Sequence, residues 1–341
     1  MTTRIFGFLA LVAVLVLVPA SGSPLLILQA TEVFVFMVAF AGLHVLSGRL
    51  GLISIGHGAF MGIGAVAGAH AVEDAGVPYL LIPIVSALFA AAFGALIAVP
   101  SLRLPGTYLA LLTVAVAMAL PIMMRRIDGP LGIRIDQDLL PPAWTGIDQG
   151  KEEVWQYLLV VGAGSAVLAL MGLLLNGRFG RSLLAVRDEP TAAAAFGINV
   201  SRTHVLGVAL ACALAGFAGG LLVFATPFVS GDRYTFDLSL FLYALMVGLG
   251  SRRLWTSIPA AVILVMLPEV LVRFGWAAYE PVVYGVLLLV ATRLTGGQGF
   301  ADRLARRRAP HAANSQEESE VLLLDPETSG GAIDDRFLTR R

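Results

Sequence analysis

The chain has 341 residues, of which 57% are hydrophobic and 13% charged, and its 23 basic and 23 acidic side chains cancel. A soluble globular protein carries about 25% charged residues, so this composition excludes that class and indicates an integral membrane protein. The one cysteine, Cys212, lies inside an apolar run, which excludes an intrachain disulfide. Nucleic-acid binding is not expected, because the basic cluster at 303–308 directly follows the last apolar run, where positive charge fixes membrane topology.

Ten apolar runs approach the length of about 20 residues that a membrane-spanning helix needs. They cover residues 5–20, 25–46, 52–71, 79–100, 107–124, 154–175, 205–225, 238–250, 255–272 and 278–294. The first run could instead be a signal peptide, since Arg4 precedes it and small residues close it, but we favour a retained helix. The eighth run is short, and some runs could be broken or re-entrant. The sequence thus predicts an all-α, polytopic membrane protein of about ten transmembrane helices.

Basic residues are distributed unevenly between the loops. If the N-terminus is inside, the inner loops hold ten arginines before the tail, whereas the outer loops hold six basic residues. Because cytoplasmic loops carry the excess of basic residues, both termini are expected in the cytoplasm. Residues 1–295 then form the transmembrane domain, with an external loop at 125–153 and a cytoplasmic loop at 176–204. The composition of residues 296–341 predicts a largely disordered cytoplasmic tail.

The span count permits an inverted repeat. No fixed-period repeat is visible in the sequence. Helices that lie five apart in the order, such as the second and the seventh, run in opposite directions, as in many transporters. Any odd offset gives the same result, so the pattern allows an inverted repeat without requiring it.

Residues 47–64, SGRLGLISIGHGAFMGIG, contain six glycines where the third run begins. Glycine weakens a helix, so we expect an unwound segment from Ser54 through Gly56 to Gly58; at membrane depth such a segment must be buried or line a cavity. Gly58 and Gly62, one turn apart, should let another backbone approach. His57 is a functional candidate as an intramembrane histidine, or else a packed histidine bonded to a neighbouring carbonyl. No metal site is expected, because no second ligand stands at suitable spacing.

Other polar residues lie within or beside the apolar runs. Tyr108 and Thr113, in LRLPGTYLALLT, could offer hydroxyls to a pathway, or serve in anchoring and packing. Glu32 and Glu269 should face protein or water, because an ionised carboxylate in hydrocarbon is costly. Three glycines of the seventh run repeat the close-packing pattern: Gly216, Gly219 and Gly220.

The charged segment 176–204 carries the signals of a short helix. Acidic residues 188–189 precede Pro190, which suits a first helical turn. Good helix formers follow from Thr191 to Phe196, and Gly197 stands where a left-handed residue usually ends a helix. About two turns are too short to be stable alone, so the helix is either a solvated loop helix or a docking helix that transmits force from another protein. No Walker, nucleophile-elbow or HExxH sequence is present, so no nucleotide-hydrolysing site is expected.

Four segments together resemble the permease subunits of branched-chain amino-acid ABC importers. They are SGRLGLISIGHGAFMGIGA, LRLPGTYLALLT, GRSLLAVRDEPTAAAAFGINVSR and VGLGSRRLWTSIPAAVILVMLPEVL. The resemblance runs from about residue 30 to 295. It implies a transport subunit of a prokaryotic plasma (inner) membrane that is no enzyme and binds no cofactor, with ATP acting through partner subunits. The implied partners are a second homologous permease, two cytoplasmic ATP-binding subunits and an extracytoplasmic solute-binding protein.

The resemblance also assigns residues. The positions that match the family's ATPase-docking segment are Glu189, Ala192, Ala193 and Gly197, with Arg187 just upstream. The candidates for the translocation pathway are Ser54, Gly56, His57, Tyr108, Thr113 and Glu32. Two alternatives stay open: an importer of urea or short amides, and a secondary transporter in which Glu32, His57 or Glu269 relays protons.

Overall fold

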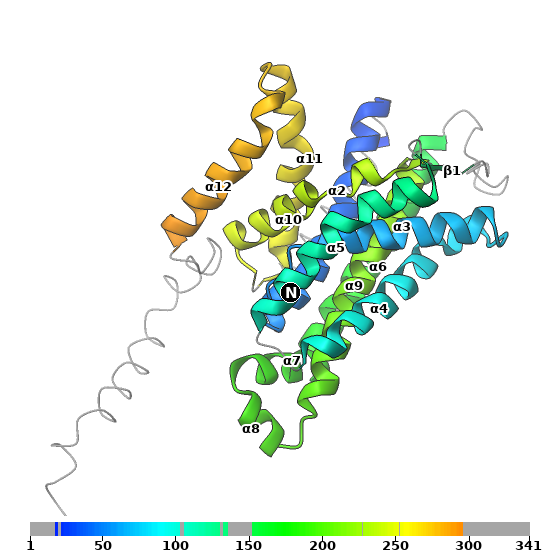
Figure 1. Ribbon diagram of the computed structural model, residues 1–341. Coiled ribbons are helices and arrows are strands. Elements are labelled where there is room, and N and C mark those ends of the chain that lie inside the picture. Colours follow the sequence, from blue (N-terminus) through cyan, green and yellow to red (C-terminus); the bar gives the residue numbers. More distant parts are fainter. Residues whose placement is uncertain are drawn as a thin grey trace, which may run out of the picture.

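The computed structural model describes residues 18–19, 22–102, 106–129, 132–135, 152–226, 228–251 and 253–295 (Figure 1). The α-helices are α2 (Pro24–Leu43), α3 (His57–Glu73), α4 (Ile82–Ser101), α5 (Gly106–Ile127), α6 (Glu152–Asn176), α7 (Arg178–Asp188), α8 (Pro190–Ala195), α9 (Val200–Ala225), α10 (Phe236–Leu249), α11 (Ser257–Arg273) and α12 (Glu280–Thr295). Short helical turns are η1 (His44–Arg49, a π-helix), η2 (Tyr79–Leu81), η4 (Gly231–Arg233), η5 (Leu254–Thr256) and η6 (Ala277–Tyr279). The strands are β1 (Ile133–Arg134) and β2 (Phe228–Val229).

Nine of the ten predicted runs coincide with helices of this described part, which confirms the all-α class. All of the first run except residues 18–19 lies outside the described residues, as do the tail 296–341 and most of the loop 125–153. Six of the described helices are long and apolar enough to cross a membrane. Helices α3, α10 and α12 have 17, 14 and 16 residues, short of the usual 20. The count of ten spans and the inverted repeat therefore stay predictions.

The bundle has two distinguishable ends (Figure 1). Helices α7 and α8, in the predicted cytoplasmic loop, protrude at one end, hereafter the α8 end. At the other end, the β end, strand β1 of the predicted external loop pairs antiparallel with β2, which follows α9, in the register Ile133↔Val229 and Arg134↔Phe228. The pairing ties the loop after α5 to the connection between α9 and α10.

Helix α9 forms the centre of the bundle and packs against α2, α3, α4 and α6. Of the six candidate spans it has the most buried apolar window, as expected of a helix that is hydrophobic all round. A Cβ atom on Gly64 would lie 2.4 Å from the Cα atom of Gly216, and one on Gly219 would lie 2.0 Å from the carbonyl oxygen of Met61. Backbone contact between α3 and α9 thus depends on glycine at these positions, which confirms the close packing predicted for the seventh run.

The details of the glycine-rich segment differ from the prediction. The atoms nearest to a Cβ on Gly62 belong to the side chains of Leu120 and Tyr234, and those nearest to a Cβ on Gly58 belong to the side chains of Leu238 and Ser239. The close backbone approach in this part of α3 occurs at Gly64 instead, because that position faces α9.

Several boundaries also differ from the prediction. Helix α3 begins at His57, five residues after the predicted start, because residues 50–56 are not helical. Helix α9 begins at Val200 rather than 205, because the Asn199 side chain caps it by accepting a hydrogen bond from the Arg202 amide at 2.9 Å.

Candidate functional site

The α8 end of the bundle consists of two short helices held on the membrane-spanning core. Leu183 of α7 is fully buried, and its side chain and that of Leu50 both pack over Gly207 of α9. Helix α7 had been missed in the sequence, where only the following helix was expected. Gly180, Leu183 and Val186, spaced three apart, form the buried face of α7. The charged residues of the same helix make this apolar face hard to recognise in the sequence.

Helix α8 has the predicted ends. Pro190 occupies its first turn, and Gly197 has a φ of +83°, the left-handed conformation that ends a helix. The amide of Gly197 donates to the carbonyl of Ala194, and the amide of Ile198 donates to that of Ala193, both at 3.0 Å. These bonds satisfy carbonyls that a six-residue helix would otherwise leave open.

The predicted docking residues fall into two groups. Glu189, Ala192 and Gly197 are exposed on the α8 tip, whereas Ala193 is buried and anchors the helix to its neighbours. Phe196, which was not among the predicted docking residues, leaves 88% of its surface exposed beside them. An exposed phenylalanine on a protruding helix is the signal that could have identified it, because aromatic side chains are enriched at interfaces.

Arg187 points away from the α8 tip. Its Nη1 atom donates a 2.7 Å hydrogen bond to the carbonyl of Gly48 in η1, and only 22% of its side chain is exposed. A Cβ atom on Gly51, where φ is +71°, would lie 3.0 Å from Cγ of Arg187. Arg187 therefore connects α7 to the chain that leads into residues 50–56.

Residues 50–56, between η1 and α3, are not helical, whereas the unwound segment was expected at residues 54–58. The expectation is confirmed for Ser54 to Gly56 and wrong for His57 and Gly58, which form the first turn of α3. The Ile55 amide donates to Oγ1 of Thr113 at 3.2 Å, which ties the segment to α5. A Cβ atom on Gly56 would lie 2.3 Å from the carbonyl oxygen of Thr113, so only glycine fits there. The Ser54 side chain is fully buried, and its hydroxyl has no hydrogen-bond partner among the described residues.

His57 begins α3 and is buried. Its Nε2 atom lies 2.9 Å from the carbonyl oxygen of Ala39 on α2, so that nitrogen carries the proton and donates. This is the contact that the packing interpretation of His57 requires. The next amide, that of Gly58, donates to Oγ of Ser239 on α10 at 3.1 Å. Three helices, α2, α5 and α10, thus hold the junction between segment 50–56 and α3.

The remaining pathway candidates do not join this junction. Glu32 lies seven residues before Ala39 on α2, about 10 Å along the helix axis, and forms an ion pair with Arg233 of η4. Glu269 pairs with Arg273 one turn later at 3.2 Å. The backbone of Tyr108 belongs to α5, but its side chain is outside the described part. The three proposed proton-relay residues therefore each have their own partner.

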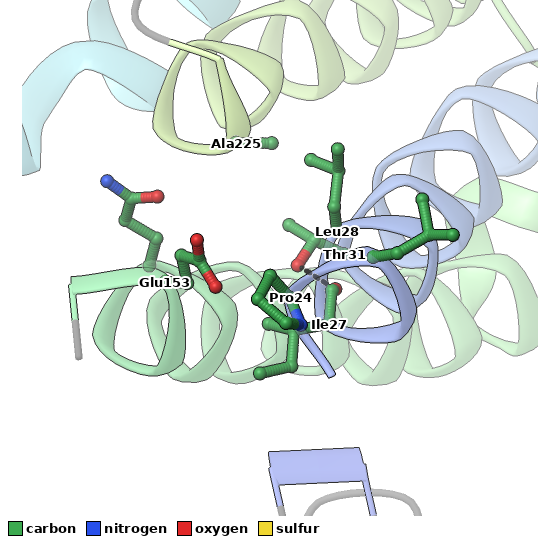
Figure 2. A pocket seen from close by; sticks show the side chains of 8 residues that line it. Pro24, Ile27, Leu28, Thr31, Glu153 and Ala225 are labelled. Carbon is green, nitrogen blue, oxygen red and sulfur yellow. Dashed lines mark hydrogen bonds between the residues drawn. The ribbon is translucent and has the colours of Figure 1, made fainter. Parts of the chain in front are cut away.

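Two cavities lie toward the β end of the bundle. One, of about 350 Å³, is enclosed by α2, α6 and α9; Figure 2 shows Pro24 and Leu28 on one side, Glu153 on another and Ala225 across from them. The other, hereafter the acidic cavity, has a volume of about 310 Å³. It is lined by Glu32, Phe36, Thr235, Asp237, Leu238, Phe241, Leu264, Val265, Pro268 and Glu280.

The acidic cavity combines two kinds of surface. Three carboxyl side chains, those of Glu32, Asp237 and Glu280, share its wall with a mainly hydrophobic set of residues. One of the hydrophobic residues, Phe241, stacks on Tyr284 with ring centroids 4.0 Å apart. This stacking holds the Phe241 ring in the cavity wall. Such a cavity is suited to a small molecule with a cationic group and an apolar body.

Comparison with known proteins gives similarity to one family model and to three proteins. A family model described as branched-chain amino acid transport system / permease component matches residues 25–292. The high-affinity branched-chain amino acid transport system permease proteins LivM of Escherichia coli and Salmonella typhimurium are each 29% identical over 289 residues, which is 76% of this chain and 66% of theirs.

A shorter similarity is to the probable branched-chain amino acid transport permease protein LivH of Methanocaldococcus jannaschii, 35% identical over 95 residues, 27% of this chain and 30% of that protein. The chain thus spans about two thirds of the length of the first two relatives. No solved structure matches.

Proposed function

This chain belongs to the family of branched-chain amino acid transport system permease components, and from that premise we propose that it is the membrane permease subunit of an ATP-driven importer. The family is a transport component rather than an enzyme. In the proposed complex, this multi-pass chain pairs with a second homologous permease in a prokaryotic inner membrane, with both termini cytoplasmic. Two ATP-binding subunits contact the α8 end, and an extracytoplasmic binding protein delivers solute to the β end.

The observation that carries this proposal is the connection from α8 to residues 50–56. The α8 tip offers Glu189, Ala192 and Phe196 to a partner. Directly behind it, Arg187 is hydrogen-bonded to Gly48, and Leu183 and Leu50 pack over the same residue of α9, Gly207. A force on α8 would therefore move η1 and the non-helical segment that follows it. Closure of the ATP-binding subunits would favour one of two conformations of the permease.

Segment 50–56 is a suitable element to move. It lacks the i to i−4 hydrogen bonds that stiffen a helix. Its Ile55 amide is held by the single hydroxyl of Thr113 on α5, and Gly56 packs against the carbonyl of the same residue. Exchange of such contacts costs less than bending a continuous helix. We infer that this segment rearranges during transport, while His57 keeps the start of α3 attached to α2.

For the substrate, we propose a branched-chain amino acid, as in the names of the relatives. The acidic cavity supports this choice, because Asp237 and Glu280 could attract an α-ammonium group while Phe36, Phe241 and Leu264 cover an aliphatic side chain. Urea and short amides carry no cation, so they could donate hydrogen bonds to these carboxylates but would lack the ionic attraction.

Purification from the native membrane tests the proposal directly. ATP-binding subunits and a second permease should co-purify, and proteoliposomes of the complex should take up leucine only with ATP and the binding protein. Uptake by this chain alone, driven by an ion gradient, would overturn the importer assignment. If the complex instead moves urea and leaves leucine outside, the importer stands and the substrate proposal fails. Asp237→Asn should weaken leucine uptake with little effect on urea.

A further inference from the structure

A third cavity, of about 310 Å³, lies at the α8 end of the bundle. It is lined by Arg49, Gly172, Leu175, Asn176, Arg253, Leu254 and Trp255. These residues come from the end of η1, the last turn of α6 and the turn η5 that precedes α11. We call it the arginine cavity.

Two arginines converge here because the backbones before them are in contact. A Cβ atom on Gly48 would lie only 2.0 Å from the carbonyl oxygen of Ser251, so η1 and the turn after α10 touch at a position that only glycine allows. Arg49 follows Gly48, and Arg253 follows Ser251 by two residues. The fold therefore places both guanidinium groups on one small cavity.

The arginine cavity carries uncompensated positive charge. No acidic residue lines it, and neither Arg49 nor Arg253 has an ion pair with a described residue. The Nε atom of Arg49 is buried and lacks a hydrogen-bond partner among the described residues. Arg181 adds a third guanidinium nearby, since its Nη1 atom donates to the carbonyl of Asn176 at 3.2 Å. A buried donor without a partner is unfavourable, so this arrangement favours an anion.

The arginines also suggest which anion. Guanidinium groups match the oxygens of phosphate and can bind them through two parallel hydrogen bonds. Asn176 and Gly172 also line the cavity, and the side-chain amide of Asn176 donates a 2.8 Å hydrogen bond to the carbonyl of Gly172, which orients the Asn176 side chain. The shared ligand chemistry is therefore a phosphate or phosphodiester group.

The position of the cavity favours a lipid over a free ion. Trp255 of η5, just before α11, leaves 53% of its surface exposed, and Leu173, three residues before Asn176, is among the most exposed leucines of α6. Both α6 and the helix that contains Trp255 are candidate membrane spans. Tryptophan is enriched where a span meets the headgroup layer, and basic pockets between spanning helices bind anionic headgroups.

We propose that the arginine cavity binds the phosphodiester headgroup of an anionic phospholipid from the surrounding bilayer. The acyl chains would lie along the exposed apolar faces of α6 and α11. Because Arg49 adjoins Gly48, which receives the hydrogen bond from Arg187, a lipid bound here would also stabilise the turn to which α7 is attached. The site does not depend on the proposed transport function.

The test uses the full chain, purified from its membrane in detergent and depleted of lipid. Thermal unfolding and native mass spectrometry are followed during titration with phosphatidylglycerol, phosphatidylcholine or inorganic phosphate. Phosphatidylglycerol should raise the melting temperature and remain bound in the mass spectrum, whereas the other two should have little effect. Equal protection by phosphatidylcholine, or protection by phosphate alone, would overturn the lipid assignment.

Variants assign the effect to the cavity. Arg253→Gln, at an exposed position, should weaken phosphatidylglycerol binding about tenfold, and Arg49→Gln should do the same if it folds. Arg202→Gln removes the same charge from an exposed position on α9 and should bind lipid like the wild type. If all three variants lose affinity equally, the effect is general surface charge and the site is refuted. Residues 315–320, SQEESE, are an acidic segment of the same chain. Cross-linking of Arg253→Cys to this segment in the presence of lipid would show that it occupies the cavity instead of a lipid.

Discussion

Arg187 at the end of α7 donates a hydrogen bond of 2.7 Å to the backbone carbonyl of Gly48, 139 residues earlier in the chain. The acceptor lies in η1, directly before the non-helical segment 50–56, and the donor lies directly before the exposed helix α8. Arg187, which the family resemblance assigns to the docking segment, thus contacts the interior of its own subunit. This relationship makes Arg187 the first residue to test.

Replacement of Arg187 by glutamine should uncouple the two elements that it joins. A hydrogen bond from a charged donor contributes about 1.5–3 kcal/mol, so ATP-driven uptake should fall about tenfold or more. The ATP-binding subunits should still co-purify, because the α8 tip is unchanged. Arg202→Gln, an equal charge change at the same end, is the control. Wild-type uptake by Arg187→Gln would contradict the coupling role.

Truncation of Phe196 should weaken assembly without weakening the fold. Since 88% of its surface is exposed, Phe196→Ala should leave the melting temperature nearly unchanged, while a lost aromatic anchor typically costs about 2 kcal/mol of binding, or about thirtyfold in affinity. Affinity for the purified ATP-binding subunit is the measurement. Phe274→Ala changes an exposed phenylalanine after α11 and serves as the control. Equal affinity of both variants would remove Phe196 from the interface.

Substitution of Gly197 can separate the effect of backbone strain on folding from an effect on docking of the ATP-binding subunit. Gly197 and Gly76 both have positive φ, +83° and +65°, and open space around the missing side chain. Valine at either position should cost about 1–2 kcal/mol in backbone strain and still permit membrane insertion. Only Gly197→Val should abolish coupled uptake, because it distorts the end of α8. Similar uptake by the two variants would show that the left-handed conformation matters for folding alone.

The contact between α3 and α9 predicts a difference between two glycines. Gly219→Ala places a methyl group 2.0 Å from the carbonyl oxygen of Met61, so the helices must separate, and a melting temperature several degrees lower is expected. Gly162→Ala on α6 meets nothing within 4 Å and should be neutral or stabilising by about 0.5–1 kcal/mol. Thermal unfolding in detergent measures both. No change in Gly219→Ala would mean that α3 and α9 can move apart without cost.

The sequence by itself determined the membrane class, most of the helices and the short helix α8 with its proline start and glycine end. These features are local: apolar length reports a span, and Pro190 and Gly197 act on their own backbone conformations. A non-helical break at Ser54 to Gly56 was predictable for the same reason, because closely spaced glycines weaken a helix wherever it packs. Its end was not predicted, since His57 and Gly58 were expected in the break and are helical. The family followed from motifs that are contiguous in the chain.

Only the tertiary structure decided what these elements contact. Arg187 was assigned to the docking surface through the family resemblance, as the residue just upstream of the matched segment, but its side chain is hydrogen-bonded to Gly48. Glu32 and His57 were grouped because both are polar residues within apolar runs, whereas Glu32 lies about two turns along α2 from Ala39, the residue that His57 contacts. The arginine cavity joins residues 49 and 253 through one backbone contact between Gly48 and Ser251. Such pairings depend on long-range packing, which a pattern of neighbouring residues does not encode.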